Sequence, residues 1–189
     1  AASKGLLWTF LDVGVSRGVG LVASILLARL LSPRDFGLMG MIYIFTALAS
    51  SLVDSGLTAS LIRTKNVNDK DFSTIFYTNF AVSLVLYVIV VCSAPLIASF
   101  YEEPILKDII RVYAFIFVIN ALSAVQQCIF TKRLDFRSLM LMNIPGIVIG
   151  AIVGIGMALL NYKVWSIVAM QLTTHMVYSL TLWLMIILF

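Results

Sequence analysis

Six long apolar runs follow one another along the chain, separated by short polar segments. They occupy roughly residues 6–31, 37–62, 73–100, 109–130, 139–160 and 164–189. Each run is long enough for a helix to cross a bilayer, which needs about 20 apolar residues. Only helices and closed barrels satisfy the backbone in lipid, and no run shows the alternation of a barrel strand. The pattern predicts an all-α, polytopic helical membrane protein with about six transmembrane helices.

Composition favours the same class of protein. Of the 189 residues, 61% are hydrophobic and 12% are charged, whereas soluble domains are about 45–50% apolar and about 25% charged. The net charge of +4 comes largely from short loops, so it does not indicate a nucleic-acid partner. Cys92 and Cys128 lie inside apolar runs and are expected to be small buried hydrophobic residues. The sequence shows no catalytic motif, metal-ligand spacing or phosphate loop, so we expect no enzyme, metal or cofactor.

The loops predict an orientation in the membrane, because cytoplasmic loops are enriched in Lys and Arg. Segments 63–71 and 131–138 hold Arg63, Lys65, Lys70, Lys132, Arg133 and Arg137, whereas the alternate loops hold only Arg34, Lys107 and Lys163. We therefore expect both richer loops, and both termini of this segment, to be cytoplasmic. Arg29 and Arg111 are expected to snorkel from span ends, and Glu102 and Glu103 to be solvated.

Arg17 is the residue that most strongly indicates a function, because it lies near the middle of the first apolar run. A charge at that depth costs about 3 kcal/mol by insertion scales unless it faces protein or water. Other runs carry polar residues three or four positions apart, which places them on one helix face. We expect a hydrophilic cavity whose substrate-binding residues are Arg17, Ser50, Asp54, Asn79, Gln127, Gln171 and His175.

Structural alternatives exist for the same residues. Polar side chains also hold membrane helices together, each contributing about 0.6 kcal/mol. Arg17 and Asp54 are alternatively a buried salt bridge, and His175 is either a buried structural group or a proton-linked one. Gly146, Gly150 and Gly154 are spaced four apart, which favours close packing against another helix.

Two segments resemble a family signature. LLARLLSPRDFGLMGM at residues 26–41 and SLVDSGLTASLIR at residues 51–63 are similar to the N-terminal signature of bacterial polysaccharide and O-antigen repeat-unit flippases. YEEP and TKRLDFR, further along the chain, also fit that pattern. These proteins belong to the multidrug/oligosaccharidyl-lipid/polysaccharide exporter superfamily.

The resemblance implies one lobe of a two-lobed transporter, with the C-terminal lobe missing from this chain. It implies flipping of undecaprenyl-pyrophosphate-linked oligosaccharides across the bacterial inner (plasma) membrane, for lipopolysaccharide and other surface polysaccharides. The implied partners are the lipid-linked oligosaccharide, membrane lipids and a coupling cation, H⁺ or Na⁺. Arg17 is the residue that fits the family's cationic cavity position facing the pyrophosphate.

Two other functions remain open at this point. A cation-coupled drug exporter of the same superfamily would favour acidic cavity residues and an apolar pocket, whereas an arginine with many hydroxyl groups favours an anionic sugar-lipid. An inactive or assembly membrane fragment is the second alternative, and the absence of a second lobe favours it.

Overall fold

The computed structural model describes residues 2–53, 69–133 and 135–188, and this part of the chain is helical without any strand. The helices are α1 (Ala2–Leu30), α2 (Pro33–Val53), α4 (Asp69–Phe100), α5 (Ile105–Tyr113), α6 (Phe115–Lys132), α7 (Phe136–Leu159) and α8 (Val164–Leu188). The predicted all-α class is confirmed.

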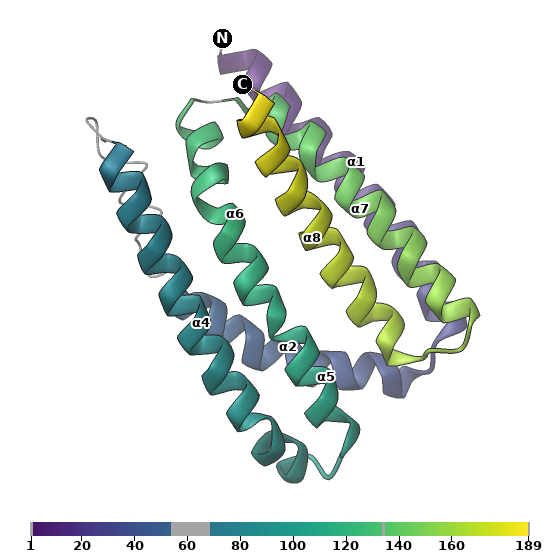
Figure 1. The fold of residues 1–189 in the computed structure, drawn as a ribbon. Helices are drawn as coiled ribbons and strands as arrows, with labels where there is room; N and C mark the ends of the chain where they lie inside the picture. Colours follow the sequence, from purple (N-terminus) through teal and green to yellow (C-terminus); the bar gives the residue numbers. More distant parts are fainter. Residues whose placement is uncertain (1, 54–68, 134, 189) are drawn as a thin grey trace.

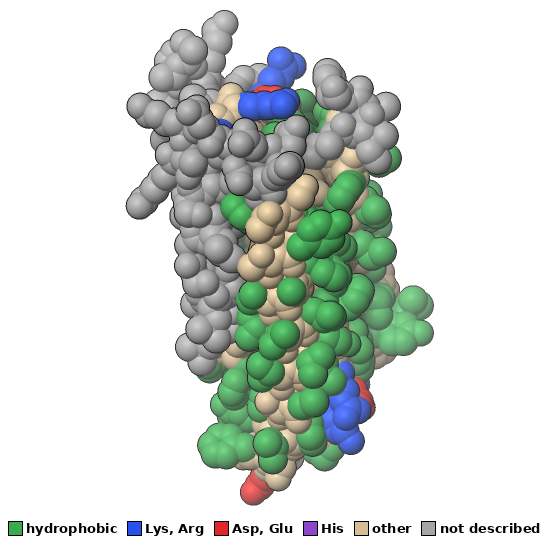
Figure 2. All heavy atoms as spheres, turned by 60° about the vertical axis from the view of Figure 1, so that its left-hand side comes forward, with side chains coloured by type: hydrophobic (Ala, Val, Ile, Leu, Met, Phe, Trp, Pro, Cys, Tyr) green, Lys and Arg blue, Asp and Glu red, His purple; other side chains and the backbone are tan. Residues whose placement is uncertain are grey.

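Four stretches of the described helices are long and apolar enough to cross a membrane. They are Ser73–Phe100, Ile105–Lys132, Arg137–Leu159 and Val164–Met185, which correspond to the third to sixth predicted spans. On the face seen in Figure 2, charged side chains gather near the two ends of the molecule and apolar side chains cover its length. The chain is therefore a multi-pass membrane protein, while the first two predicted spans stay predictions.

The long helices run side by side, and α2 crosses them at a steep angle (Figure 1). Helix α7 packs against both α1 and α8, whereas α4 packs against α5 and α6, and contacts between α6 and α8 join the two groups. The turns after α1, α4 and α7 lie at one end of the bundle, and the turn after α6 lies at the other (Figure 1). These described turns fit the predicted alternation of loops, but most of loop 63–71 lies outside the described residues, so the full alternation and the side of the membrane stay predictions.

The glycine face of α7 lies directly against α8. A Cβ atom would lie 2.7 Å from the Thr174 carbonyl oxygen at Gly146, 2.8 Å from the Met170 carbonyl oxygen at Gly150, and 2.7 Å from Met170 Cβ at Gly154. Real Cβ atoms do not approach other atoms so closely, so these positions have no room for a side chain. The predicted close packing is confirmed.

Two aspartates from the family signature make hydrogen bonds at helix starts, Asp35 in the first turn of α2 and Asp135 directly before α7. The Asp35 carboxylate accepts hydrogen bonds from the Ser32 backbone N–H at 3.0 Å and from Ser32 Oγ at 2.7 Å. At the start of α7, Asp135 accepts from the Ser138 backbone N–H at 3.2 Å and from Ser138 Oγ at 2.6 Å. Both carboxylates thus satisfy backbone N–H groups that a helix start leaves unpaired. These signature residues define the start of a helix, and neither lines the groove described below.

Helix α5 departs from the prediction, because the fourth apolar stretch begins at Ile105 and not at residue 109. Pro104 precedes its first turn, a place where proline is well tolerated. The helix is amphipathic: it buries Leu106 and Ile109, and it exposes Lys107 and Arg111. Arg111 lies inside the candidate span Ile105–Lys132 and not at its end, so its expected snorkelling stays a prediction.

Two expectations about single side chains were wrong. Glu103 was expected to be solvated, but Arg34 Nη2 lies 2.7 Å from both of its carboxylate oxygens. This hydrogen bond, and then the charge of the carboxylate, raises the pKa of the Arg34 guanidinium and ties the start of α2 to the α4–α5 turn. Cys128 is buried as expected, but Cys92 is exposed, because it lies on the outer side of α4, which has few covering neighbours.

Candidate functional site

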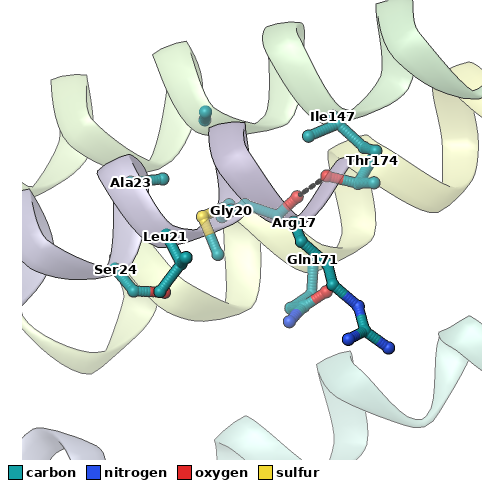
Figure 3. A pocket seen from close by; sticks show the side chains of 10 residues that line it. Arg17, Gly20, Leu21, Ala23, Ser24, Ile147, Gln171 and Thr174 are labelled. Carbon is teal, nitrogen blue, oxygen red and sulfur yellow. Dashed lines mark hydrogen bonds between the residues drawn. The ribbon is translucent and has the colours of Figure 1, made fainter. Parts of the chain in front are cut away.

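An open groove of about 580 Å³ lies between α1, α7 and α8. Its lining residues are Arg17, Gly20, Leu21, Ala23 and Ser24 from α1, Ile147 and Ala151 from α7, and Met170, Gln171 and Thr174 from α8 (Figure 3). The groove combines an apolar wall with a small number of polar groups and one positive charge. This combination is typical of sites that bind a ligand carrying both apolar and polar parts.

The groove lies at mid-depth of the helix bundle. Thr174 comes ten residues after Val164, where α8 begins, and each helical residue advances about 1.5 Å. Thr174 is therefore about 15 Å along α8, near the middle of the 22-residue candidate span Val164–Met185. The Arg17 charge and the few polar groups of the groove therefore lie at a depth where the surrounding bilayer is hydrocarbon.

Arg17 is exposed in the structure and is not sealed among apolar side chains. Figure 3 shows its guanidinium and the Gln171 amide extending in the same direction, away from Ile147 on α7. None of the acidic side chains that the structure describes forms an ion pair with Arg17. Its predicted neighbour Asp54 lies outside the described residues, so the alternative of a buried salt bridge between them remains untested.

Small residues on α1 keep the groove open. Gly20 lines the groove, and a Cβ atom added there would meet nothing within 4 Å, in contrast to the crowded glycines of α7. Ser24 is exposed one turn further along. On α8, Thr174 Oγ1 donates to the Met170 carbonyl oxygen at 2.8 Å, so its proton is used within the helix and the hydroxyl oxygen retains only its capacity as an acceptor (Figure 3).

Gln171 connects the groove to α2. Its Nε2 atom donates a hydrogen bond to Tyr43 Oη at 3.1 Å. The Tyr43 ring is in turn held edge-on to Tyr113 of α5, with the ring centroids 6.1 Å apart. One wall residue of the groove is thus fixed by an aromatic pair from two other helices.

Of the seven predicted site residues, the structure brings Arg17 and Gln171 together in one groove. Asn79 on α4 is buried, Gln127 on α6 is exposed and His175 on α8 is half-buried, and none of these three lines the groove. Ser50 belongs to α2 but its side chain is not described, and Asp54 is outside the described residues. The substrate-binding assignments of all seven residues stay predictions.

The prediction missed buried polar residues on α6 and α8. Gln126 on α6 is 5% exposed and Ser166 on α8 is fully buried, and neither Gln126 Oε1 nor Ser166 Oγ has a partner in the described structure. In the sequence, Asn120, Ser123 and Gln127 lie three or four positions apart, and this spacing predicts a polar helix face that includes Gln127. The adjacent pair of glutamines was the available signal, because Gln126 also lies one turn from Ser123 on the buried side of α6.

Comparison with known proteins identifies the family. The model of a family described as polysaccharide biosynthesis protein matches residues 26–188, which is most of the chain. The chain therefore belongs to the polysaccharide biosynthesis protein family. The resemblance seen in the signature segments is confirmed, although Arg17 lies before the matched residues.

Several curated proteins are similar to the chain. The lipopolysaccharide biosynthesis protein WzxC of Escherichia coli K12 is 25% identical over 147 residues, 78% of this chain and 30% of the relative. The succinoglycan biosynthesis transport protein ExoT of Rhizobium meliloti is 22% identical over 170 residues, which are 90% of this chain and 34% of the relative. The teichuronic acid biosynthesis protein TuaB of Bacillus subtilis is 29% identical over 136 residues, which are 72% of this chain and 28% of the relative. The chain spans about a third of the length of these relatives. No solved structure gives a significant match.

Proposed function

We propose that the chain forms one lobe of a transporter that flips undecaprenyl-pyrophosphate-linked oligosaccharides across the bacterial inner membrane. The family and its relatives support a role in polysaccharide biosynthesis, and one relative is described as a transport protein. The observation that carries the proposal is Arg17, which lines an open, largely apolar groove with a few polar groups at mid-depth of the bundle.

The physical problem that such a protein solves is the polar headgroup. A pyrophosphate with attached sugars cannot cross about 30 Å of hydrocarbon unaided, because each unpaired polar group loses its hydrogen bonds to water. The Arg17 guanidinium offers a planar fork that pairs with two phosphate oxygens at once. Gln171, Ser24 and Thr174 offer neutral hydrogen-bonding groups beside it. The lipid tail remains in the bilayer throughout.

Transport then requires that the groove opens to each side of the membrane in turn. In secondary transporters this happens when one helical repeat rocks against another around a fixed site at the midplane. In the proposed cycle Arg17 holds the pyrophosphate while the lobes rock. Asp54 restrains Arg17 in the empty state or binds the coupling cation, H⁺ or Na⁺.

The test of this proposal uses bacterial cells whose surface polysaccharide depends on the gene of this protein, with each variant introduced into that chromosomal gene. Arg17→Ala removes both charge and fork, whereas Arg17→Lys keeps the charge without the bidentate geometry. We expect Ala to abolish surface polysaccharide and Lys to reduce it, at equal membrane abundance. Arg29→Ala is the matched control, because Arg29 is an exposed arginine of the same helix that does not line the groove. Normal export by Arg17→Ala would refute the proposal.

A second variant separates binding from structure. If Arg17 pairs with Asp54, removing the arginine leaves an unpaired buried charge, which destabilises a protein by about 3–5 kcal/mol. Arg17→Ala combined with Asp54→Asn removes that penalty. We expect the double variant to reach normal abundance without exporting polysaccharide. Restored export would show that Arg17 is a structural partner of Asp54 and not a ligand of the sugar-lipid.

A further inference from the structure

The contact between α2 and α8 adds a second feature to the groove. We propose that Tyr43 and Gln171 form a sugar-binding subsite beside Arg17, and that this subsite takes the first sugar ring attached to the pyrophosphate. The inference rests on the proposed function, because it assigns the sugar side of the headgroup whose phosphate side Arg17 holds.

Gln171 belongs to both parts of the arrangement. It lines the groove together with Arg17, and its Nε2 atom lies 3.1 Å from Tyr43 Oη. The tyrosine hydroxyl is therefore directly beside the groove wall. The bond uses one of the two N–H groups of the amide. The Gln171 amide extends to the same side as the Arg17 guanidinium (Figure 3), and its hydrogen bond places the Tyr43 phenol next to that amide.

The Tyr43 ring is both anchored and accessible. It is 39% exposed, whereas its partner Tyr113 is 5% exposed and belongs to the buried face of α5. The two rings meet edge to face, with an interplanar angle of 70°. Such a contact fixes the orientation of one ring without covering all of it. An aromatic ring with a polar tip, next to an amide, presents an apolar surface and hydrogen-bonding groups together.

This combination matches the chemistry of a sugar. A pyranose ring has an apolar side made of C–H groups and a rim of hydroxyl groups, which suit a ring face and an amide respectively. In a lipid-linked oligosaccharide the first sugar is bonded directly to the pyrophosphate. A headgroup whose phosphate pairs with Arg17 therefore brings its first sugar to the adjoining wall, where Gln171 and Tyr43 lie.

Binding of defined probes to the full-length protein in lipid nanodiscs tests the assignment. One probe is a short-chain polyprenyl pyrophosphate without sugar, and the others carry a single glucose, galactose or N-acetylglucosamine. The variants are Tyr43→Leu, Tyr43→Phe and Gln171→Ala. Tyr77→Leu serves as the matched control, because Tyr77 is a 69% exposed tyrosine on α4 that does not line the groove.

We expect wild type to bind at least one sugar-bearing probe more tightly than the bare probe. Tyr43→Leu should weaken binding of that sugar-bearing probe by about three- to tenfold, which is the range of a typical aromatic contact. It should leave binding of the bare probe unchanged. Tyr43→Phe, which keeps the ring, should lose less than Tyr43→Leu. Gln171→Ala combined with Tyr43→Leu should reduce the affinity for the sugar-bearing probe by less than the product of the two single reductions, because the two residues act on one sugar.

The outcomes separate this inference from the proposed function. If Arg17→Ala leaves binding of the bare probe unchanged, the anion site and the proposed function both fail. If Arg17→Ala weakens every probe but Tyr43→Leu weakens the bare and sugar-bearing probes equally, Tyr43 only braces the helices and the sugar subsite is wrong. Equal binding of all probes by wild type also overturns the subsite. If Tyr43→Leu does not fold, the effects of Tyr43→Phe and Gln171→Ala on the same pair of probes decide.

Discussion

Adding one methyl group at Gly150 should loosen the interface between α7 and α8, the two helices that form one side of the groove. A Cβ atom at this position meets the Met170 carbonyl oxygen at 2.8 Å and also the Thr174 side chain. The carbonyl belongs to the helix backbone, so it cannot move aside unless α8 itself moves. Because Met170 and Thr174 line the groove, the same displacement should change its shape.

The magnitude follows from two opposing contributions. Overpacking a close contact costs about 1–3 kcal/mol. Replacing glycine by alanine inside a helix returns about 1 kcal/mol, because alanine loses less backbone entropy on folding. The control Gly156→Ala lies on the same helix, and its Cβ would meet nothing within 4 Å. The helix contribution cancels between the two variants, so Gly150→Ala should be less stable than Gly156→Ala by about 1–3 kcal/mol.

The assay is the unfolding equilibrium of each purified variant in mixed micelles with increasing denaturing detergent, monitored by circular dichroism. We expect the midpoint of Gly156→Ala to equal or exceed that of wild type, and the midpoint of Gly150→Ala to fall below both. Equal stability of the two alanine variants would refute the packing derived for α7 and α8.

Two further predictions concern topology and helix capping. In a protein without native cysteines, Ser138→Cys should be shielded from a membrane-impermeant thiol reagent in intact cells and Tyr162→Cys should react; reversed labelling would contradict the predicted orientation. Asp35→Ala removes the acceptor for the Ser32 N–H and hydroxyl groups, so it should lower stability by about 1 kcal/mol in the same detergent assay. Asp108→Ala removes an exposed carboxylate from the first turn of α5, where in the described structure it interacts only with the helix dipole, so it should cost less stability than Asp35→Ala. An equal loss in both variants would refute the capping role of Asp35.

Local patterns in the sequence were sufficient to predict much of the fold. Length and hydropathy determine which segments become membrane helices, because lipid leaves the backbone few alternatives. The four-residue spacing of Gly146, Gly150 and Gly154 was sufficient to predict a close helix contact, since it depends on one helix only. The steep crossing of α2 was not predictable, because the tilt of a helix is set by its packing against neighbours and not by its own composition.

The candidate site, like the fold, was predictable where it depends on a local pattern and not where it depends on packing between helices. A lone arginine within an apolar run indicated a functional position, and the structure places Arg17 in a groove with Gln171. Which helices share that groove depends on contacts of α1 with α7, which lie far apart in the sequence. The tie between Gln171 and Tyr43 joins residues 128 positions apart, so no local pattern contains it. Contacts between distant segments also decide which glutamine of α6 is buried. The structure buries Gln126, whereas the spacing of polar residues along the chain predicts Gln127 on the inward face.

The central claim is that Arg17 holds the pyrophosphate while the headgroup crosses the membrane. It is tested most directly by transbilayer movement of a sugar-bearing polyprenyl pyrophosphate in vesicles reconstituted with the full-length protein. The readout is protection of the sugar from an impermeant lectin, compared for wild type, Arg17→Ala, Arg17→Lys and the control Arg29→Ala. We predict normal movement by wild type and Arg29→Ala, slower movement by Arg17→Lys, and no movement above protein-free vesicles by Arg17→Ala. Movement by Arg17→Ala at the wild-type rate would contradict the account.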